Sequence, residues 1–228
     1  MSTVFVTGTG TDIGKTFVVA RLLQIMRRNG FDARAIKPVV SGFDPGKAAV
    51  SDPGLLLSAM GGAISPDAIH AISPFRFAAP LAPDLAAPKE GRRLSVAEIV
   101  AFCRAKIAES KGPLLIEGVG GVMSPIANDG TGLDVIKALK IPAALVAGTY
   151  LGAISHALTA VSAIRSAGVD LRVVGVNESE GGSIGLGLTI ESLRRFLPGV
   201  EVQGIRRGAG HADFARFAGA CGFAVRPT

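Results

Sequence analysis

The feature that most constrains this chain is a glycine-rich loop, Gly8–Thr16, between a short apolar run at Val4–Val6 and an apolar-periodic helical segment. Glycines allow backbone N–H groups to turn inward around phosphate oxygens, and the first turn of a following helix presents further N–H groups to an anion. Lys15 can reach the outer phosphates, and the hydroxyl of Thr16 can bind a magnesium ion. The loop therefore predicts a nucleoside triphosphate site in a strand–loop–helix unit.

The spacing of this loop differs by one residue from G-x-x-x-x-G-K-[ST], because five residues separate Gly8 from Gly14. The glycines also form G-x-G-x-x-x-G, a pattern close to that of a dinucleotide-binding loop. Two features oppose that interpretation. Lys15-Thr16 directly follows the last glycine, and the next strand ends in Lys37-Pro38 rather than in a ribose-binding carboxylate. A triphosphate site is the favoured interpretation, with a plain strand-to-helix turn as the structural alternative.

The composition is typical of a soluble α/β protein. The 228 residues, 48% of them hydrophobic, suffice for one domain with a large core, and residues 1–228 contain no evident linker. The formal net charge of +6 comes from scattered basic pairs, and the chain has one Tyr and no Trp to form an aromatic platform, so we expect no nucleic-acid partner. Cys103 and Cys221 lie far apart in the sequence, which is typical of reduced thiols in a cytoplasmic protein.

One long segment, Ile141–Ile164, contains no Asp, Glu, Lys or Arg and is long enough to cross a bilayer. Prolines, glycines and polar residues interrupt it. It is better interpreted as a strand at Ile141–Ala147, a loop at Gly148–Gly152 and a helix at Ala153–Ala167. The first sixteen residues form the expected strand and phosphate loop, which leaves no room for a secretory signal. We therefore expect no association with a membrane.

Strand and helix patterns alternate along the chain. Further strands are expected at Val4–Thr7, Ala33–Lys37, Leu114–Glu117, Arg172–Asn177 and near Val200–Ile205. Further helices are expected at Lys15–Asn29, Asp52–Met60, Val96–Ser110 and Leu133–Leu139, whereas Ile69–Pro88 is expected to be extended, proline-punctuated chain over the site. Apolar runs such as Leu114–Ile116 lack alternation, which marks strands covered on both faces. The pattern predicts a single domain with a mostly parallel sheet flanked by helices on both faces.

Ligands of open parallel sheets bind beyond the carboxyl ends of the strands. Lys37, Ser41 and Glu117 stand at or just after such ends. A carboxylate that ends a buried strand needs a partner, so Glu117 is expected to hold magnesium together with Thr16. Asp52 is a further candidate ligand, although an Asp before Pro is more often a turn or cap residue. Lys37 is expected beside phosphate or a developing anion, with a solvated lysine as the equal alternative.

These motifs together resemble the dethiobiotin synthetase family. The resemblance covers roughly the first four-fifths of the chain, and the K-P-V-x-S-G and E-G-x-G-G patterns are far more specific than the phosphate loop alone. The matching segments, in order and spacing, are Thr7–Thr16, Ile36–Gly42, Ser51-Asp52, Glu117–Gly121, Leu151–His156 and Val176-Asn177. The resemblance implies a P-loop NTPase fold and a ligase that uses ATP and Mg²⁺ to join CO₂ to 7,8-diaminononanoate in biotin biosynthesis. It also implies a homodimer with its active site at the subunit interface.

The resemblance also implies roles for individual residues. Lys37, Lys15 and Thr11 are the implied catalytic residues, and Thr16, Asp52 and Glu117 the implied magnesium ligands. The implied nucleotide contacts are Gly10, Thr11, Asp12, Ile13, Gly14, Lys15, Thr16, Phe17, Glu117 and the base-reading Asn177. Thr11, Lys37 and Ser41 are the implied contacts of the diamine or carbamate. The implied contacts of the substrate tail are Tyr150, Leu151 and Ser155 of the partner subunit. His156 is expected to be structural.

The chain departs from the family at several positions. Tyr150 and Ser155 stand where some members have lysine and asparagine, and Arg206 follows Gly204-Ile205 where a proline is usual. The latter leaves the choice among ATP, CTP and GTP open. The rival interpretation is a partition or septum-site ATPase, in which a similar loop acts as a nucleotide-driven dimer switch that binds DNA or membrane. Such a protein is expected to have an extra lysine in the loop, where this chain has Thr9.

Overall fold

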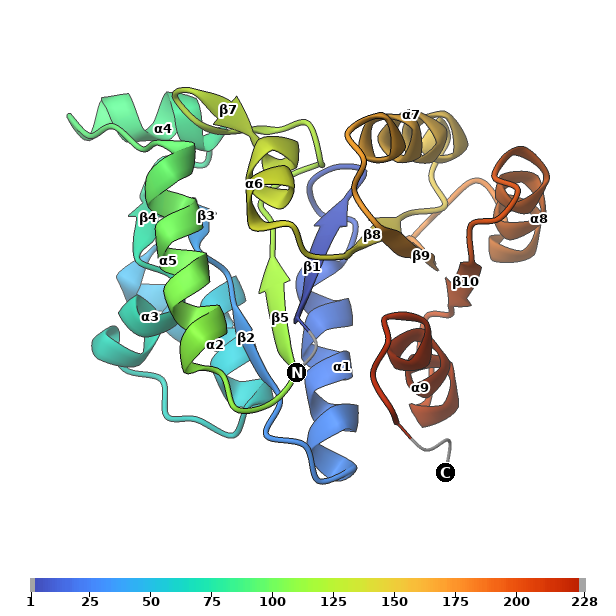
Figure 1. Cartoon of the computed structure of the whole chain (residues 1–228), viewed down its shortest axis with the longest axis horizontal. Helices are drawn as coiled ribbons and strands as arrows, with labels where there is room; N and C mark the ends of the chain where they lie inside the picture. The colour runs from blue at the N-terminus through green and yellow to red at the C-terminus, as the bar shows by residue number, and fades with distance from the viewer. Residues whose placement is uncertain (1–2, 226–228) are drawn as a thin grey trace.

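The computed structural model describes residues 3–225, and its centre is a six-stranded parallel sheet in the order β10-β9-β8-β1-β5-β2 (Figure 1). These strands are β1 (Thr3–Gly8), β2 (Arg34–Ile36), β5 (Leu114–Glu117), β8 (Ala143–Ala147), β9 (Leu171–Asn177) and β10 (Val202–Ile205). The register pairs Val6 of β1 with Glu117, and Ile36 of β2 with Ile116. Lys37 and Glu117 therefore leave adjacent strands side by side, next to the start of the glycine-rich loop.

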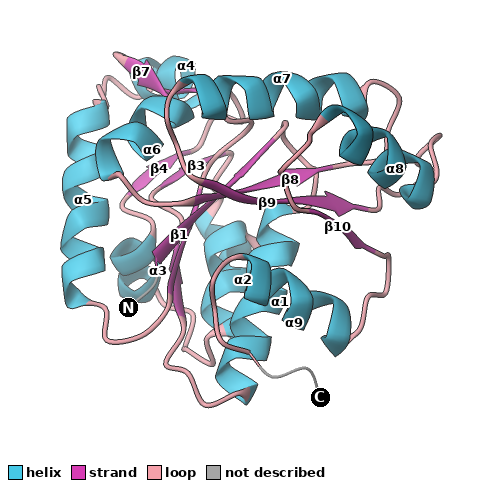
Figure 2. Cartoon of the chain, turned by 45° about the vertical axis from the view of Figure 1, so that its right-hand side comes forward, coloured by secondary structure: helices cyan, strands magenta, loops and turns pink. Residues whose placement is uncertain are grey.

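Helices cover both faces of the sheet, as the sequence pattern predicts (Figure 2). One face packs against α1 (Lys15–Arg28), α2 (Asp52–Ala59) and α9 (His211–Ala220). The other packs against α5 (Val96–Glu109), α6 (Gly132–Leu139), α7 (Ala153–Ser166) and α8 (Leu186–Phe196). Val4 and Val6 of β1 point into the first core and Phe5 into the second, so the strand is buried on both sides.

Within the described residues, two pairs of short strands and three short helical segments are separate from the main sheet and the helices that cover it. β3 (Val39–Ser41) pairs in parallel with β4 (Phe75–Phe77), and β6 (Pro125–Ala127) pairs antiparallel with β7 (Gly130–Thr131). The helical segments are η1 (Pro45–Val50), α3 (Pro66–Ile72) and α4 (Pro83–Lys89). The β3–β4 pair fixes the chain immediately after Lys37, which positions that residue at the edge of the site.

The prediction of extended chain over Ile69–Pro88 was wrong. Only Phe75–Phe77 is a strand, and helices α3 and α4 occupy both ends of the segment. Each helix begins with a proline, whose fixed φ suits the first helical turn, where a backbone N–H has no helical partner. The hydroxyl of Ser65 also caps α3 by accepting a hydrogen bond from the backbone N–H of Ala68 at 3.1 Å. Pro66 and Pro83 thus start helices, whereas Pro74 and Pro80 lie in the chain between the two helices and Pro88 lies inside α4.

The other expected elements are confirmed to within a few residues. The capping box of Ser95 and Glu98 forms at the start of α5. The uncharged segment Ile141–Ile164 contains strand β8 and most of helix α7. Among residues 3–225, every helix is too short or too polar to traverse a lipid bilayer.

Both cysteines are buried free thiols. Cys103 is fully buried in α5, and Cys221 lies at the carboxyl end of α9. Burial raises the pKa of each thiol to about 12. They therefore pack as small apolar groups and remain protonated near neutral pH.

Candidate active site

A cavity of about 400 Å³ lies beyond the carboxyl ends of β1, β2 and β5, and we call it the rim cavity. It is lined by Thr11, Asp12, Gly14, Lys15, Thr16, Lys37, Val40, Ser41, Asp52, Glu117, Val119 and Gly120. The structure thus brings most of the sequence-predicted residues together, from segments more than one hundred residues apart. Val40, Val119 and Gly120 are lining residues that belong to the matching segments Ile36–Gly42 and Glu117–Gly121 but were given no role in the sequence analysis.

The glycine-rich loop forms one wall of the rim cavity. Gly14 has φ of 86°, and a Cβ at this position would collide with the side-chain amide of Asn177, so the position requires glycine. The amide of Asn177 donates a hydrogen bond to the carbonyl of Ile13 at 3.0 Å, which ties the loop to the end of β9. The ammonium of Lys15 donates to the carbonyl of Gly10 at 2.6 Å. Burial, and secondly the nearby charge of Lys37, lowers the pKa of Lys15 from 10.5 to about 8.

An ion cluster of the buried Lys37 and Glu117 with the partly exposed Asp52 forms the floor of the rim cavity. The ammonium of Lys37 donates hydrogen bonds to Asp52 and, at 2.7 Å, to Oε1 of Glu117. The hydroxyl of Thr16 donates to the same Glu117 oxygen at 2.6 Å. Burial opposes the charge of both Lys37 and Asp52, but the attraction between the opposite charges outweighs it. The pKa of Lys37 is therefore raised and that of Asp52 lowered. Both groups are held in their charged forms.

The backbone of Lys37 is fixed from both sides by the last residue of α3 and the residue that follows it. Its N–H donates to the carbonyl of Ile72 at 3.0 Å, and its carbonyl accepts a hydrogen bond from the hydroxyl of Ser73 at 2.6 Å. Ser73 is fully buried. The sequence analysis missed Ser73. Its only signal was a polar residue in an apolar stretch before Pro74, and the contact depends on the pairing of β3 with β4.

A second cavity of about 390 Å³ lies on the other side of the loop, and we call it the Asn177 cavity. Its lining consists of Thr11, Asp12, Ile13, Gly14, Tyr150, Asn177, Glu178, Ser179, Glu180 and Arg207. The loop residues Thr11, Asp12 and Gly14 line both cavities, so the two are neighbours. One elongated molecule bound across the loop could therefore occupy both.

Three charged residues of the Asn177 cavity, Glu178, Glu180 and Arg207, were not predicted from the sequence as site residues. Arg207 donates to Glu178 through its backbone N–H at 2.8 Å and to Glu180 through its guanidinium at 2.7 Å. The neighbouring Arg206, where the family usually has proline, forms an ion pair with Asp213 of α9 at 3.1 Å. The arginine at this position thus connects the end of β10 to α9.

The remaining sequence-predicted residues lie away from the rim cavity. Phe17 is partly exposed on α1 and packs edge-on against Phe214, with ring centroids 5.8 Å apart. Leu151 is 82% exposed, Ser155 is exposed on the first turn of α7, and neither lines the two cavities described above. The hydroxyl of Tyr150 lies 2.9 Å from Nδ1 of the exposed His156.

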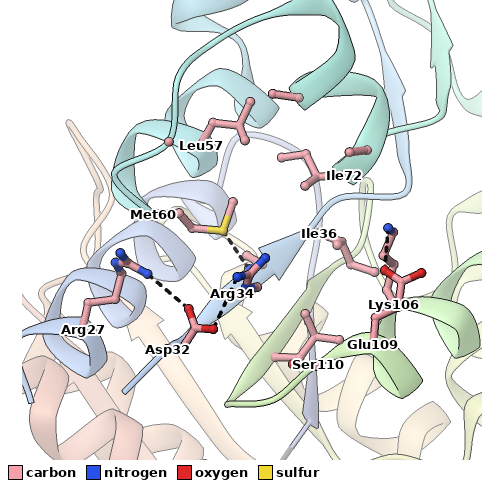
Figure 3. Close-up of a pocket in the computed structure, with 15 residues that line it drawn as sticks. Arg27, Asp32, Arg34, Ile36, Leu57, Met60, Ile72, Lys106, Glu109 and Ser110 are labelled. Atoms are coloured by element: carbon pink, nitrogen blue, oxygen red, sulfur yellow. Dashed lines mark hydrogen bonds and ion pairs between the residues drawn. The ribbon is translucent and has the colours of Figure 1, made fainter. Parts of the chain in front are cut away.

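A third cavity, of about 430 Å³, lies beside edge strand β2, between α2, α3 and α5, and we call it the edge cavity (Figure 3). Apolar side chains including Leu57 and Ile72 form part of its wall, and charged residues surround it. Its cationic groups already have acidic partners: Asp32 lies 3.7 Å from Arg27 and 3.3 Å from Arg34. Lys106 pairs with Glu109 at 2.9 Å.

Comparison with known proteins agrees with this description of the fold. A family model described as an AAA domain matches residues 2–204. The chain is 49% identical over 217 residues to the ATP-dependent dethiobiotin synthetase of Methylobacterium nodulans. The aligned region covers 92% of this chain and 95% of that relative. It is 46% identical over 198 residues to the synthetase of the same name from Acidiphilium cryptum, with coverage of 86% and 89%.

Solved structures show the same fold at low identity. The hydrogenase maturation factor HypB from Archaeoglobus fulgidus superimposes with a TM-score of 0.59 at 12% identity, covering 97% of this chain and 90% of that one. The MinC:MinD cell division complex of Aquifex aeolicus gives 0.56 at 12% identity, with coverage of 90% and 81%. These likenesses establish the fold alone, whereas the curated relatives distinguish the family. The chain belongs to the ATP-dependent dethiobiotin synthetase family and has the P-loop NTPase fold.

Proposed function

We propose that this protein is a dethiobiotin synthetase. Residues 1–228 act as one domain that joins CO₂ to 7,8-diaminononanoate and closes a cyclic urea, while ATP becomes ADP and phosphate. The observation that carries this proposal is the convergence of Lys15, Lys37, Thr16, Asp52 and Glu117 on the rim cavity. Two lysines and an acidic cluster beside a phosphate loop suit a reaction that must bring two anions together.

The reaction proceeds in three steps. One amine of the diamine attacks CO₂, forming an N–C bond and losing a proton to give a carbamate. A carbamate oxygen then attacks the terminal phosphorus of ATP, and the bond to the ADP oxygen breaks to give a carbamic–phosphoric anhydride. The second amine attacks the carbamate carbon and loses a proton, the bond from that carbon to the phosphate oxygen breaks, and phosphate leaves as the ring closes. The diamine supplies both nucleophiles, so the protein's task is to position and neutralise charge.

The residues of the rim cavity divide this task. Lys15 binds the outer phosphates from the loop, and Lys37 neutralises the carbamate and the terminal phosphate where negative charge accumulates. Thr11 and Ser41 line the same cavity and are proposed contacts of the diamine or carbamate. Because the charged side chains of Lys15 and Lys37 are buried, their attraction for anions is weakly screened by solvent.

The donor set on this chain fits a magnesium ion. Thr16, Asp52 and Glu117 provide a hydroxyl and two carboxylates, and Mg²⁺ prefers hard oxygen ligands. The second oxygen of Glu117, Oε2, is buried and has no hydrogen-bond partner among residues 3–225. Within that range no group of three or more His, Cys, Asp or Glu side chains is suitably placed for a metal, so phosphate and water oxygens would complete the coordination. Bound there, the ion would supply Lewis-acid stabilisation of the phosphates.

Asn177 is the proposed reader of the adenine base. It lies at the end of β9 and lines the Asn177 cavity. One of its amide hydrogens is used in the bond to Ile13, and an amide has a second hydrogen and a carbonyl oxygen to offer a base edge. ATP is therefore the proposed nucleotide, with the Asn177 cavity as the base site.

We further propose a cytoplasmic homodimer without nucleic-acid or membrane partners. Leu151 and Ser155 are exposed at the start of α7 and line neither the rim cavity nor the Asn177 cavity of their own subunit. A partner subunit would bring these residues to the carboxylate tail of the substrate. Backbone N–H groups at the start of α7 suit that anion. Sedimentation of the protein with and without substrate would test this arrangement.

The central test is mass-spectrometric detection of dethiobiotin. Purified protein is incubated with 7,8-diaminononanoate, bicarbonate, Mg²⁺ and ATP, CTP or GTP in separate reactions. Dethiobiotin that depends on diamine and nucleotide, and matches the ADP released, is the expected result. No dethiobiotin, together with nucleotide hydrolysis stimulated by DNA or lipid vesicles, would instead support the nucleotide-switch alternative.

A further inference from the structure

The ammonium of Lys37 contacts one oxygen of each carboxylate that is proposed to bind the metal, while Oε2 of Glu117 has no hydrogen-bond partner among residues 3–225. Oε1 of Glu117 accepts a hydrogen bond from Lys37 at 2.7 Å and another from Thr16 at 2.6 Å. Lys37 also contacts a carboxylate oxygen of Asp52. The ammonium therefore already pairs with both acidic groups that would bind a divalent cation.

The two positive charges cannot share this position without cost. Lys37 is 4% exposed and Glu117 1% exposed, so solvent hardly screens the repulsion between an ammonium and a nearby divalent cation. Lys15 is less directly involved, because its ammonium donates to the carbonyl of Gly10 in the loop. Of the two buried lysines, Lys37 is the one that holds the carboxylates.

We propose that Lys37 and a divalent cation compete for Asp52 and Glu117, so that cation binding releases the ammonium of Lys37 toward the terminal phosphate. This inference rests on the proposed function, which takes the two carboxylates as metal ligands. It adds that the lysine becomes available for phosphoryl transfer only after the cation has replaced it.

The structure also limits what can move. The backbone of Lys37 is held by Ile72 and Ser73, and its carbonyl bond to the buried Ser73 hydroxyl is 2.6 Å long. The side chain has a flexible four-carbon stem. The exchange is therefore a rotation of the side chain about a fixed Cα, without a shift of the strand.

The first experiment measures Mn²⁺ binding without nucleotide, by electron paramagnetic resonance, for the wild type and Lys37→Met. Removing the competing ammonium is expected to tighten Mn²⁺ binding at least about tenfold, equivalent to about 1.4 kcal/mol. Lys47→Met is the matched control, because Lys47 is an exposed lysine of η1. The Mn²⁺ affinity of this variant is expected to stay within about twofold of the wild type. Adding Glu117→Gln to Lys37→Met should abolish the gain. Equal Mn²⁺ affinity in Lys37→Met and Lys47→Met would overturn the inference.

A second experiment uses the wild-type protein, in case Lys37→Met does not fold. Protein labelled with ¹⁵N-lysine is titrated with Mg²⁺ and the ammonium resonances are followed by NMR, with Lys37 identified by a Lys37→Arg variant. A protected Lys37 signal that shifts and exchanges faster as Mg²⁺ saturates is the expected result. An unchanged signal at saturation contradicts the release of Lys37. Either failure leaves dethiobiotin formation untouched, so the proposed function and this inference fail separately.

Discussion

The rim cavity and the edge cavity have nearly the same volume, about 400 and 430 Å³, and both are lined by charged residues. They differ in how those charges are arranged. In the rim cavity, Lys37 and Glu117 are almost fully buried, and one oxygen of Glu117 has no hydrogen-bond partner within residues 3–225. In the edge cavity, the side chains of Arg34 and Asp32 are 64% and 51% exposed and form an ion pair with each other.

This difference teaches that volume does not identify a site in this fold. Exposed ion pairs such as Arg34–Asp32 contribute about 0–1 kcal/mol and attract ligands weakly. Buried charge is costly unless it is compensated, so a protein that keeps a Lys–Asp–Glu cluster beside a phosphate loop has a chemical use for it. The same substitution made in each cavity should therefore have very different consequences.

The largest contrast is expected between Lys37→Gln and Lys106→Gln. Lys37→Gln removes a cation from the phosphoryl-transfer position and should lower kcat about 10²–10³-fold while ATP still binds. Lys106→Gln should leave kcat within about twofold. Steady-state dethiobiotin formation and calorimetric ATP titration measure the two effects. A Lys37→Gln enzyme with near-normal turnover would remove this lysine from the mechanism.

Glu117→Gln and Glu109→Gln form the next pair. Glu117→Gln keeps the shape of the side chain but removes its negative charge. That charge holds Lys37 and is proposed to bind the metal, so kcat should fall about 10²-fold. The Mg²⁺ concentration for half-maximal rate should rise. Glu109→Gln breaks only the surface pair with Lys106. Rate measurements over a Mg²⁺ series check this pair, and identical Mg²⁺ curves for the two variants would contradict the assignment of Glu117.

Ser73→Ala and Ser110→Ala compare two buried hydroxyls that donate to backbone carbonyls. Ser73 donates to Lys37 at 2.6 Å, and Ser110, in the wall of the edge cavity, donates to Gly112 at 2.9 Å. Both variants should lose about 1–3 kcal/mol of unfolding free energy. Only Ser73→Ala should also lower kcat, about tenfold, with little change in KM for ATP, because Lys37 loses its fixed position. Chemical denaturation and steady-state kinetics separate the two effects, and an equal kcat in both variants would limit Ser73 to stability.

Arg34→Ala should have the smallest effect. Its guanidinium is exposed and pairs only with Asp32 among the described residues, so the unfolding free energy should change by about 0.5 kcal/mol or less. Activity should stay within about twofold. A thermal melt and a dethiobiotin assay suffice, and an activity loss above about fivefold would show that the edge cavity takes part in the reaction.

Much of the architecture could be predicted from the sequence, because the relevant physics is local. The glycine-rich loop, the capping box of Ser95 and Glu98 and the doubly buried strands each depend on residues within a few positions of one another. The main local failure was Ile69–Pro88, where prolines were interpreted as punctuation of extended chain although the segment starts inside α3 and Pro83 begins α4. A proline is compatible with both, and local pattern alone did not distinguish them.

Only the tertiary structure decided how the site is connected. The sequence placed Lys37 and Glu117 at the same sheet edge, but not in one ion cluster with Asp52, and it contained no clear sign that Ser73 holds the backbone of Lys37. The pairs Lys37–Glu117 and Ser73–Lys37 are 80 and 36 residues apart. Contacts at such separations arise because parallel strands, joined by crossovers, bring their carboxyl ends to one edge. The sequence by itself determined the chemical groups and the edge at which they gather; strand register and the β3–β4 pair determined which groups touch.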